Sequence, residues 1–155
     1  EKRPNDLEGH ILLARIETGL ENYLAASKAQ KRVLELKEGS SDEEDYFYLA
    51  ELLILATNGY ISPEAESALE KVLEINPQNQ PALFYIGLMM AQNGRPDYTF
   101  KIWNKLLKTS PKGSPWLETI YAQMEGIAEM AGIKNYNLSN INQFPDKTKK
   151  KKKYT

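Results

Sequence analysis

The sequence predicts an all-α protein in which helical hairpins stack in a row and a final single helix closes the row. The first observation is a period, because leucines recur 34 residues apart at Leu49, Leu83 and Leu117. The second is that apolar residues within each period recur at steps of three and four, the spacing of an amphipathic helix. The third is that Asn-Gly pairs interrupt the apolar runs at 58–59 and 93–94, as such pairs do at turns. Because one hairpin cannot bury its apolar face alone, this repetition predicts stacking.

A period of 34 residues with two helical stretches is typical of tetratricopeptide (TPR) repeats. We therefore expect a TPR-type α-solenoid over residues 1–133, made of about three helix–turn–helix repeats and a C-terminal capping helix. The expected units span about residues 4–36, 46–77 and 80–111, and the expected capping helix spans residues 115–131. Residues 134–155 are rich in Asn and then in Lys, without helical spacing, and we expect them to form a disordered tail.

Short motifs predict where several helices begin and end. Ser62, followed by Pro63, is a candidate N-cap, since proline suits the first helical position. Ser41 with Glu44 three residues later resembles a capping box. Gly132 is a plausible C-cap, and Gly87 lies where two helices would need a small residue to approach closely.

Composition excludes several kinds of chemistry. The 155 residues, 41% of them hydrophobic, suit one domain with a continuous core, and the absence of cysteine excludes disulfides and thiolate sites. His10 is the only histidine, and at a core position it is more typical of packing than of catalysis. No nucleophile–base pair or phosphate-binding loop is present. We therefore expect a protein that is not an enzyme and that uses no metal or cofactor. No run reaches the roughly 18–20 apolar residues of a membrane span.

The charge of the chain is unevenly distributed. Its formal net charge is -1, but six lysines lie between Lys147 and Thr155, which leaves -7 for the rest. A lysine run could bind anionic lipid or nucleic acid. No aromatic platform is interleaved with these lysines, and the body is acidic. We therefore expect no nucleic acid partner.

The concave face of the predicted array is the candidate binding site. In repeats of this type the first helix of each pair lines that face, and in the second and third units this helix is apolar nearly all round. An apolar stripe with a few polar groups suits an amphipathic helix lying in a groove. The candidate apolar contacts are Phe47, Ile54, Phe84 and Leu88, and the residues expected to set the orientation of the bound helix are Arg15, Glu51, Tyr85 and Gln92. The alternative is that the apolar members pack on neighbouring helices of the chain itself.

Four segments of the chain resemble one family more closely than the repeat pattern alone would. These segments are RPNDLEGHILLA, GYISPEAESALEKVLEINPQNQPAL, GLMMAQNGRPDYTFKIWNKLL and SPKGSPWLETIYAQMEGIAEMAGI. They are similar to the periplasmic repeat domain of the CcmI/CycH family, which serves the maturation of c-type cytochromes. The resemblance covers Arg3 to about Ile133, and the lysine run lies outside it.

The resemblance implies a chaperone that holds apocytochrome c by its C-terminal helix and delivers it to the haem ligation complex. It also implies a periplasmic domain that is tethered to the inner membrane by an N-terminal segment absent from this chain. Two alternatives stay open. One is a generic TPR interaction scaffold in another bacterial envelope complex. The other is an enzyme or haem-handling protein, in which His10 would ligate haem.

Overall fold

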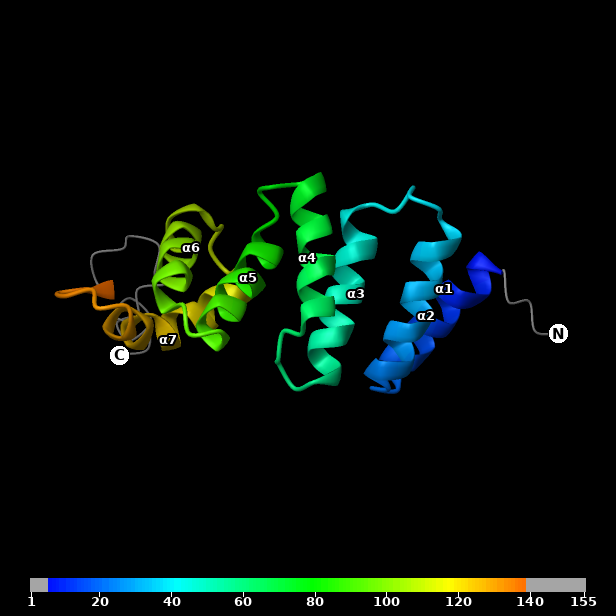
Figure 1. Cartoon of the computed structure of the whole chain (residues 1–155), viewed down its shortest axis with the longest axis horizontal. Helices are drawn as coiled ribbons and strands as arrows, with labels where there is room; N and C mark the ends of the chain where they lie inside the picture. The colour runs from blue at the N-terminus through cyan, green and yellow to red at the C-terminus, as the bar shows by residue number, and fades with distance from the viewer. Residues whose placement is uncertain (1–5, 139–155) are drawn as a thin grey trace, which may run out of the picture.

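The computed structural model describes residues 6–138, and within that range the chain forms seven α-helices and no strand. Their bounds are α1 Leu7–Gly19, α2 Tyr23–Leu36, α3 Glu43–Ala56, α4 Pro63–Ile75, α5 Gln80–Gln92, α6 Pro96–Thr109 and α7 Pro115–Met130. The helices follow one another along the long axis of the molecule, from α1 at one end to α6 and α7 at the other (Figure 1). The all-α class is confirmed, and the arrangement is consistent with a TPR-like α-solenoid.

Each described helix packs against the next one in the chain, and α5 also contacts α7. Successive hairpins are additionally joined across one repeat interval. The hydroxyl of Tyr48 on α3 donates to the carbonyl oxygen of Ala14 on α1 at 3.2 Å. No described helix combines the length and hydropathy that crossing a bilayer requires.

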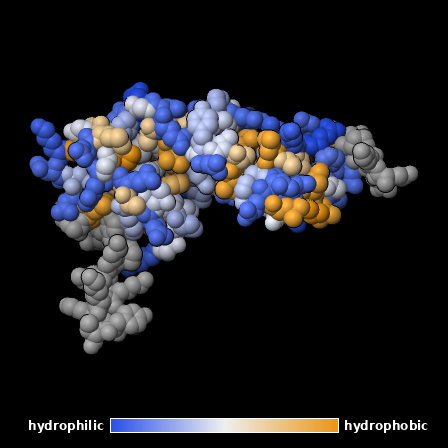
Figure 2. All heavy atoms as spheres, turned by 90° about the horizontal axis from the view of Figure 1, so that it is seen from below, coloured by the Kyte–Doolittle hydropathy of each residue, from blue (hydrophilic) through white to orange (hydrophobic). Residues whose placement is uncertain are grey.

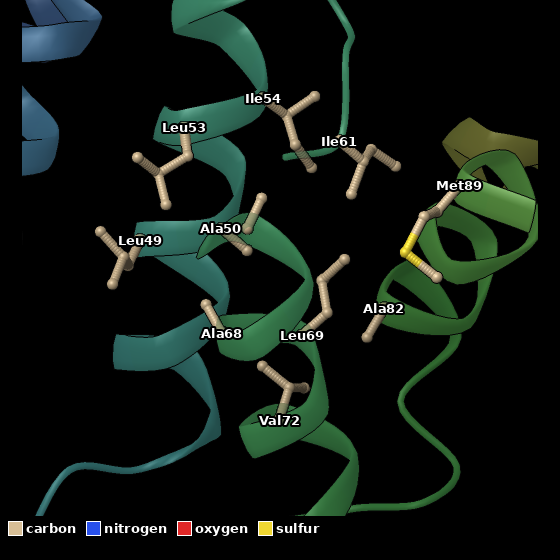
Figure 3. Packing of buried hydrophobic residues seen from close by; sticks show 11 residues of the cluster. Leu49, Ala50, Leu53, Ile54, Ile61, Ala68, Leu69, Val72, Ala82 and Met89 are labelled. Carbon is tan, nitrogen blue, oxygen red and sulfur yellow. The ribbon is translucent and has the colours of Figure 1, made fainter. Parts of the chain in front are cut away.

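Two clusters of buried apolar residues share α5. The first cluster joins α3, α4 and α5, and Figure 3 shows Ala82 and Met89 of α5 pointing toward α4, with Ile61 nearby. The second joins α6 and α7 around Trp103. Leu88 of α5 packs against both clusters. The core is therefore continuous from the second hairpin to the last helix.

The expected close approach at Gly87 is present. A Cβ atom at Gly87 would lie 2.6 Å from Cδ1 of Trp103, which is closer than real side chains pack. The indole Nε1 of the fully buried Trp103 donates to the carbonyl oxygen of Phe84 at 3.1 Å. The buried Thr99 hydroxyl donates to the carbonyl oxygen of Gly87 at 2.7 Å, so it is satisfied within the helix pair α5–α6.

The N-cap at Ser62 is confirmed, because its hydroxyl accepts from the amide of Ala65. The capping box expected at Ser41 and Glu44 is wrong by one residue. Asp42 is the N-cap of α3, and it forms the reciprocal pair with Asp45. The physical reason is that the Asp45 carboxylate also binds Lys37 of α2 at 2.7 Å, which favours Asp45 at the third helical position.

The C-terminal end differs from expectation over five residues. Gly132 adopts a φ of 74° after α7, as a glycine that ends a helix does. Residues 134–138, expected to be disordered, lie against the second cluster instead. The ring of Tyr136 meets that of Phe100 edge-on at 5.1 Å, and Leu138 packs nearby. The rest of the expected tail, with its lysines, lies outside the described residues.

Candidate functional site

A hollow lies where the start of α3 faces the loop between α4 and α5. It has a cavity volume of about 480 Å³. The residues that line it are Glu43, Glu44, Phe47, Tyr48, Glu51, Asn76, Gln78, Asn79, Gln80 and Pro81. We call this hollow the α3–α5 groove. It exists because the first helices of two successive hairpins begin side by side, joined by the short turn after α4.

Aromatic rings connect the α3–α5 groove to the interior of the third hairpin. Phe47 on the groove wall lies 6.0 Å from Tyr85, measured between ring centroids. Tyr85 meets Phe84 edge-on at 5.3 Å, and Phe84 stacks on Trp103 at 5.5 Å with only 7° between the rings. Because Trp103 is fully buried, this row of rings is held from its inner end. The groove wall is therefore apolar and preorganised.

Glu43 on the groove rim is fixed by two amides from the turn after α4. The side chains of Asn76 and Asn79 each donate to its Oε2 at 2.9 Å. These hydrogen bonds, first that from Asn79 and then that from Asn76, lower the pKa of Glu43. Asn79 also caps α5, since its side-chain oxygen accepts from Ala82 at 3.0 Å. The rim therefore carries a fixed negative charge.

Glu51 is the carboxylate without a partner in this groove. It is partly buried, and burial raises the pKa of its carboxyl group. It forms no hydrogen bond or ion pair with the residues that the structure describes. The pKa of Tyr85 is raised as well, first by burial and then by the nearby charge of Glu51. An ionised Glu51 would therefore gain from a cation brought to it in the groove.

The structure brings only some of the expected site residues together. Phe47 and Glu51 line the groove, and Tyr85 contacts Phe47. Phe84 lies one ring further in, against Trp103. Leu88 is partly buried between the two clusters.

The other three expected residues do not line the groove. Ile54 is only 3% exposed and belongs to the first cluster, because Ile61 and α4 close over it. Gln92 bonds to the loop after α3, accepting from the amide of Ile61 and donating to the carbonyl oxygen of Gly59. Arg15 is exposed on α1.

Sequence reasoning missed the polar half of the groove. Glu43 was interpreted as part of an acidic linker, and Asn76 with Pro77 as a helix stop. Asn79 precedes the third unit by one residue, and its spacing of 36 from Glu43 carried a signal. Residues about one repeat apart lie side by side in such arrays, so an acid and an amide at that distance could have been paired.

The fold and this groove together define a class. The chain is a TPR-like row of helical hairpins with a shallow groove that has an aromatic wall and an acidic rim. Sites of this kind hold extended or helical segments of other proteins through apolar anchors and a few polar contacts.

Comparison with known proteins shows which relatives have a similar sequence. No family model matches the chain. The chain is 27% identical over 124 residues to the "Cytochrome c-type biogenesis protein CycH" of Bradyrhizobium diazoefficiens, covering 80% of this chain and 33% of that protein. It is 33% identical over 82 residues to the CycH protein of Rhizobium meliloti, covering 53% of this chain and 21% of that protein. The expected resemblance to the CcmI/CycH family is confirmed, and the chain spans a third or less of the relatives that it matches.

Proposed function

We propose that this chain is a non-enzymatic chaperone or adaptor of c-type cytochrome maturation. Its α3–α5 groove holds apocytochrome c, by the C-terminal helix of that client, until the client reaches the haem ligation complex. The names of the two CycH relatives support a role in cytochrome c biogenesis. By the same relation we place the chain in the periplasm, next to the inner membrane.

The observation that carries the proposal is the pairing of an apolar wall with an unpartnered carboxylate. Phe47 and Tyr85 offer aromatic surface, and Glu51 lies in the same groove without a hydrogen-bond partner. An amphipathic helix with a basic edge satisfies both at once, because its apolar face covers the rings and its lysines meet Glu51 and the rim. Negative charge on the rim also steers a basic client toward the groove.

The energetics suit transient holding. A dissociation constant in the micromolar range corresponds to about 8 kcal/mol of net binding free energy. A few buried anchors can supply that much, because a small fraction of contacts carries most of the energy of an interface. A site open on one side also allows the client to leave when the ligation machinery competes for it.

The test is calorimetric titration with a peptide of the C-terminal helix of a c-type cytochrome. Phe47→Ala removes an anchor, and Glu44→Lys reverses an exposed charge on the rim. We expect each to weaken binding by about tenfold, which is about 1.4 kcal/mol. Phe84 is a poorer choice for substitution, because its stacking on Trp103 makes it part of the core.

Glu118→Lys is the matched control for the charge reversal. Glu118 is also exposed at the first turn of a helix, but on α7 and outside the groove lining. It should bind the peptide as the unaltered chain does. The assignment of the groove would be refuted by equal affinity for the chain with Glu44→Lys and the chain with Glu118→Lys, with both folded by circular dichroism.

A further inference from the structure

The largest group of exposed apolar side chains is at the α1–α2 end of the molecule, away from the α3–α5 groove. Figure 2 shows hydrophobic residues gathered there. Between 44% and 64% of each of these side chains is exposed, and they are Leu12, Leu13, Ile16, Leu20 and Leu24. Monomeric proteins seldom leave such a contiguous apolar patch uncovered without a use for it.

This surface corresponds to one that is buried elsewhere in the same chain. Leu13 and Ile16 are related to Ile86 and Met89 by two repeat intervals. On α5 these positions belong to the first cluster, and Figure 3 shows Met89 directed toward α4. The outer face of α1 is therefore built as a helix-packing face, but no described helix covers it.

The spacing along that face is self-complementary. Gly9, Leu13, Ile16 and Leu20 follow one another at intervals of four, three and four residues. This is the seam along which two helices pack with small left-handed crossing angles. The series reads the same in both directions, so a second α1 running antiparallel sets Leu13 against Ile16 and the large Leu20 against the small Gly9. A Cβ atom at Gly9 would meet only the side chain of Asp6, so the outer side of Gly9 is open.

We propose that this face, Gly9–Leu13–Ile16–Leu20 with Leu12 and Leu24 beside it, is the interface of a symmetric dimer of this chain. The occupant of each face is the α1 of a second copy. Two copies bring ten half-exposed apolar side chains together, on the scale of the about 1,000 Å² that the smallest specific interfaces bury. The dimer is therefore weak and reversible, and it leaves both α3–α5 grooves free.

Sedimentation velocity over a concentration series tests the dimer. The unaltered chain should show a reversible monomer–dimer equilibrium, and Ile16→Glu should raise the dissociation constant by at least about 100-fold, because each dimer gains two buried charges. Met130→Glu is the matched control, since Met130 is 66% exposed on α7, and it should dimerise normally. Peptide binding in the groove should be the same in all three proteins.

Disulfide trapping tests the antiparallel register. The chain has no cysteine, so single variants report one contact each. An oxidised mixture of Leu13→Cys and Ile16→Cys should yield mainly the mixed disulfide, because only that pair comes within bridging distance.

Three results would overturn the proposal. One is a chain that stays monomeric up to about 1 mM, which would leave another protein's helix as the occupant. The second is a dimer that Ile16→Glu does not weaken. The third is trapping of like pairs in preference to the mixed pair, which would exclude the antiparallel register.

Discussion

Gly87 is the position at which one added methyl group has the clearest consequence. Its amide plane lies directly beneath the Trp103 ring, and Trp103 in turn supports Phe84 and the row of rings that reaches the α3–α5 groove. Displacing the indole would also weaken its hydrogen bond to the carbonyl oxygen of Phe84. A small residue here therefore supports both the helix pair and the groove wall.

We predict that Gly87→Ala lowers the free energy of unfolding by about 1–3 kcal/mol, the usual cost of overpacking a core. Gly126→Ala is the control, because Gly126 is also helical but has open space around it. That change should raise stability by about 0.5–1 kcal/mol, since alanine is the better helix former. Urea unfolding measures both. Effects of the same sign would contradict the close packing described for Trp103.

The pKa of Glu51 has a defined consequence for stability. Burial raises this pKa in the folded state above the ordinary value of 4.5, so folding favours the protonated carboxyl. The free energy of unfolding is therefore lower when Glu51 is ionised, and it recovers as the pH falls through the raised pKa. Glu51→Gln removes that cost at neutral pH, and its advantage should disappear below about pH 4.5.

At the scale of single elements, the helix starts differ in how well they are capped. Ser62 accepts a hydrogen bond from the amide of Ala65, whereas Ser114 at the start of α7 makes no such bond and donates instead to the carbonyl oxygen of Pro111. Both serines precede a proline at the first helical position, so the two helix starts form a matched pair.

Ser62→Ala should therefore cost about 1 kcal/mol of stability, the usual value of an N-cap. Ser114→Ala should cost only a few tenths of a kcal/mol, because its exposed hydroxyl caps nothing. Thermal unfolding followed by circular dichroism would distinguish the two variants. If both cost the same, the hydrogen bond at Ser62 contributes nothing measurable to α4.

The elements predicted well from sequence are those determined by local spacing. The apolar periodicity of α3 and α5 and the Ser62-Pro63 start are local signals, and they are present in the structure. The N-cap of α3 depended on Lys37 of another helix, so Ser41 and Asp42 could not be ranked from their own neighbourhood. Tyr136 is ordered by a ring 36 residues away, which no local pattern reports.

The groove could be predicted only in part for the same reason. Repeat positions place Phe47 and Glu51 on the concave side, as found. Whether Ile54 is exposed depends on how closely the loop at Ile61 folds over α3, and that is a tertiary property. The amides that hold Glu43 come from the turn after α4, so they became visible only when the two hairpins were side by side.

At the scale of the whole molecule, one stack of hairpins offers two different surfaces. The α3–α5 groove is aromatic and acidic, and its unpartnered carboxylate suits a basic helix. The outer face of α1 is apolar and self-complementary, and it suits a second copy. Because the two surfaces lie on different hairpins, client binding and self-association are separable by substitution.

The most direct test of the central claim is a paired measurement on Glu51→Gln at pH 7, of its stability and of its affinity for the cytochrome helix peptide. A carboxylate that is kept for a basic client lowers stability in the empty protein and contributes only when the client is bound. The account predicts a variant that is more stable than the unaltered chain and binds the peptide about tenfold more weakly. A variant that is more stable and binds equally well or more tightly would contradict it.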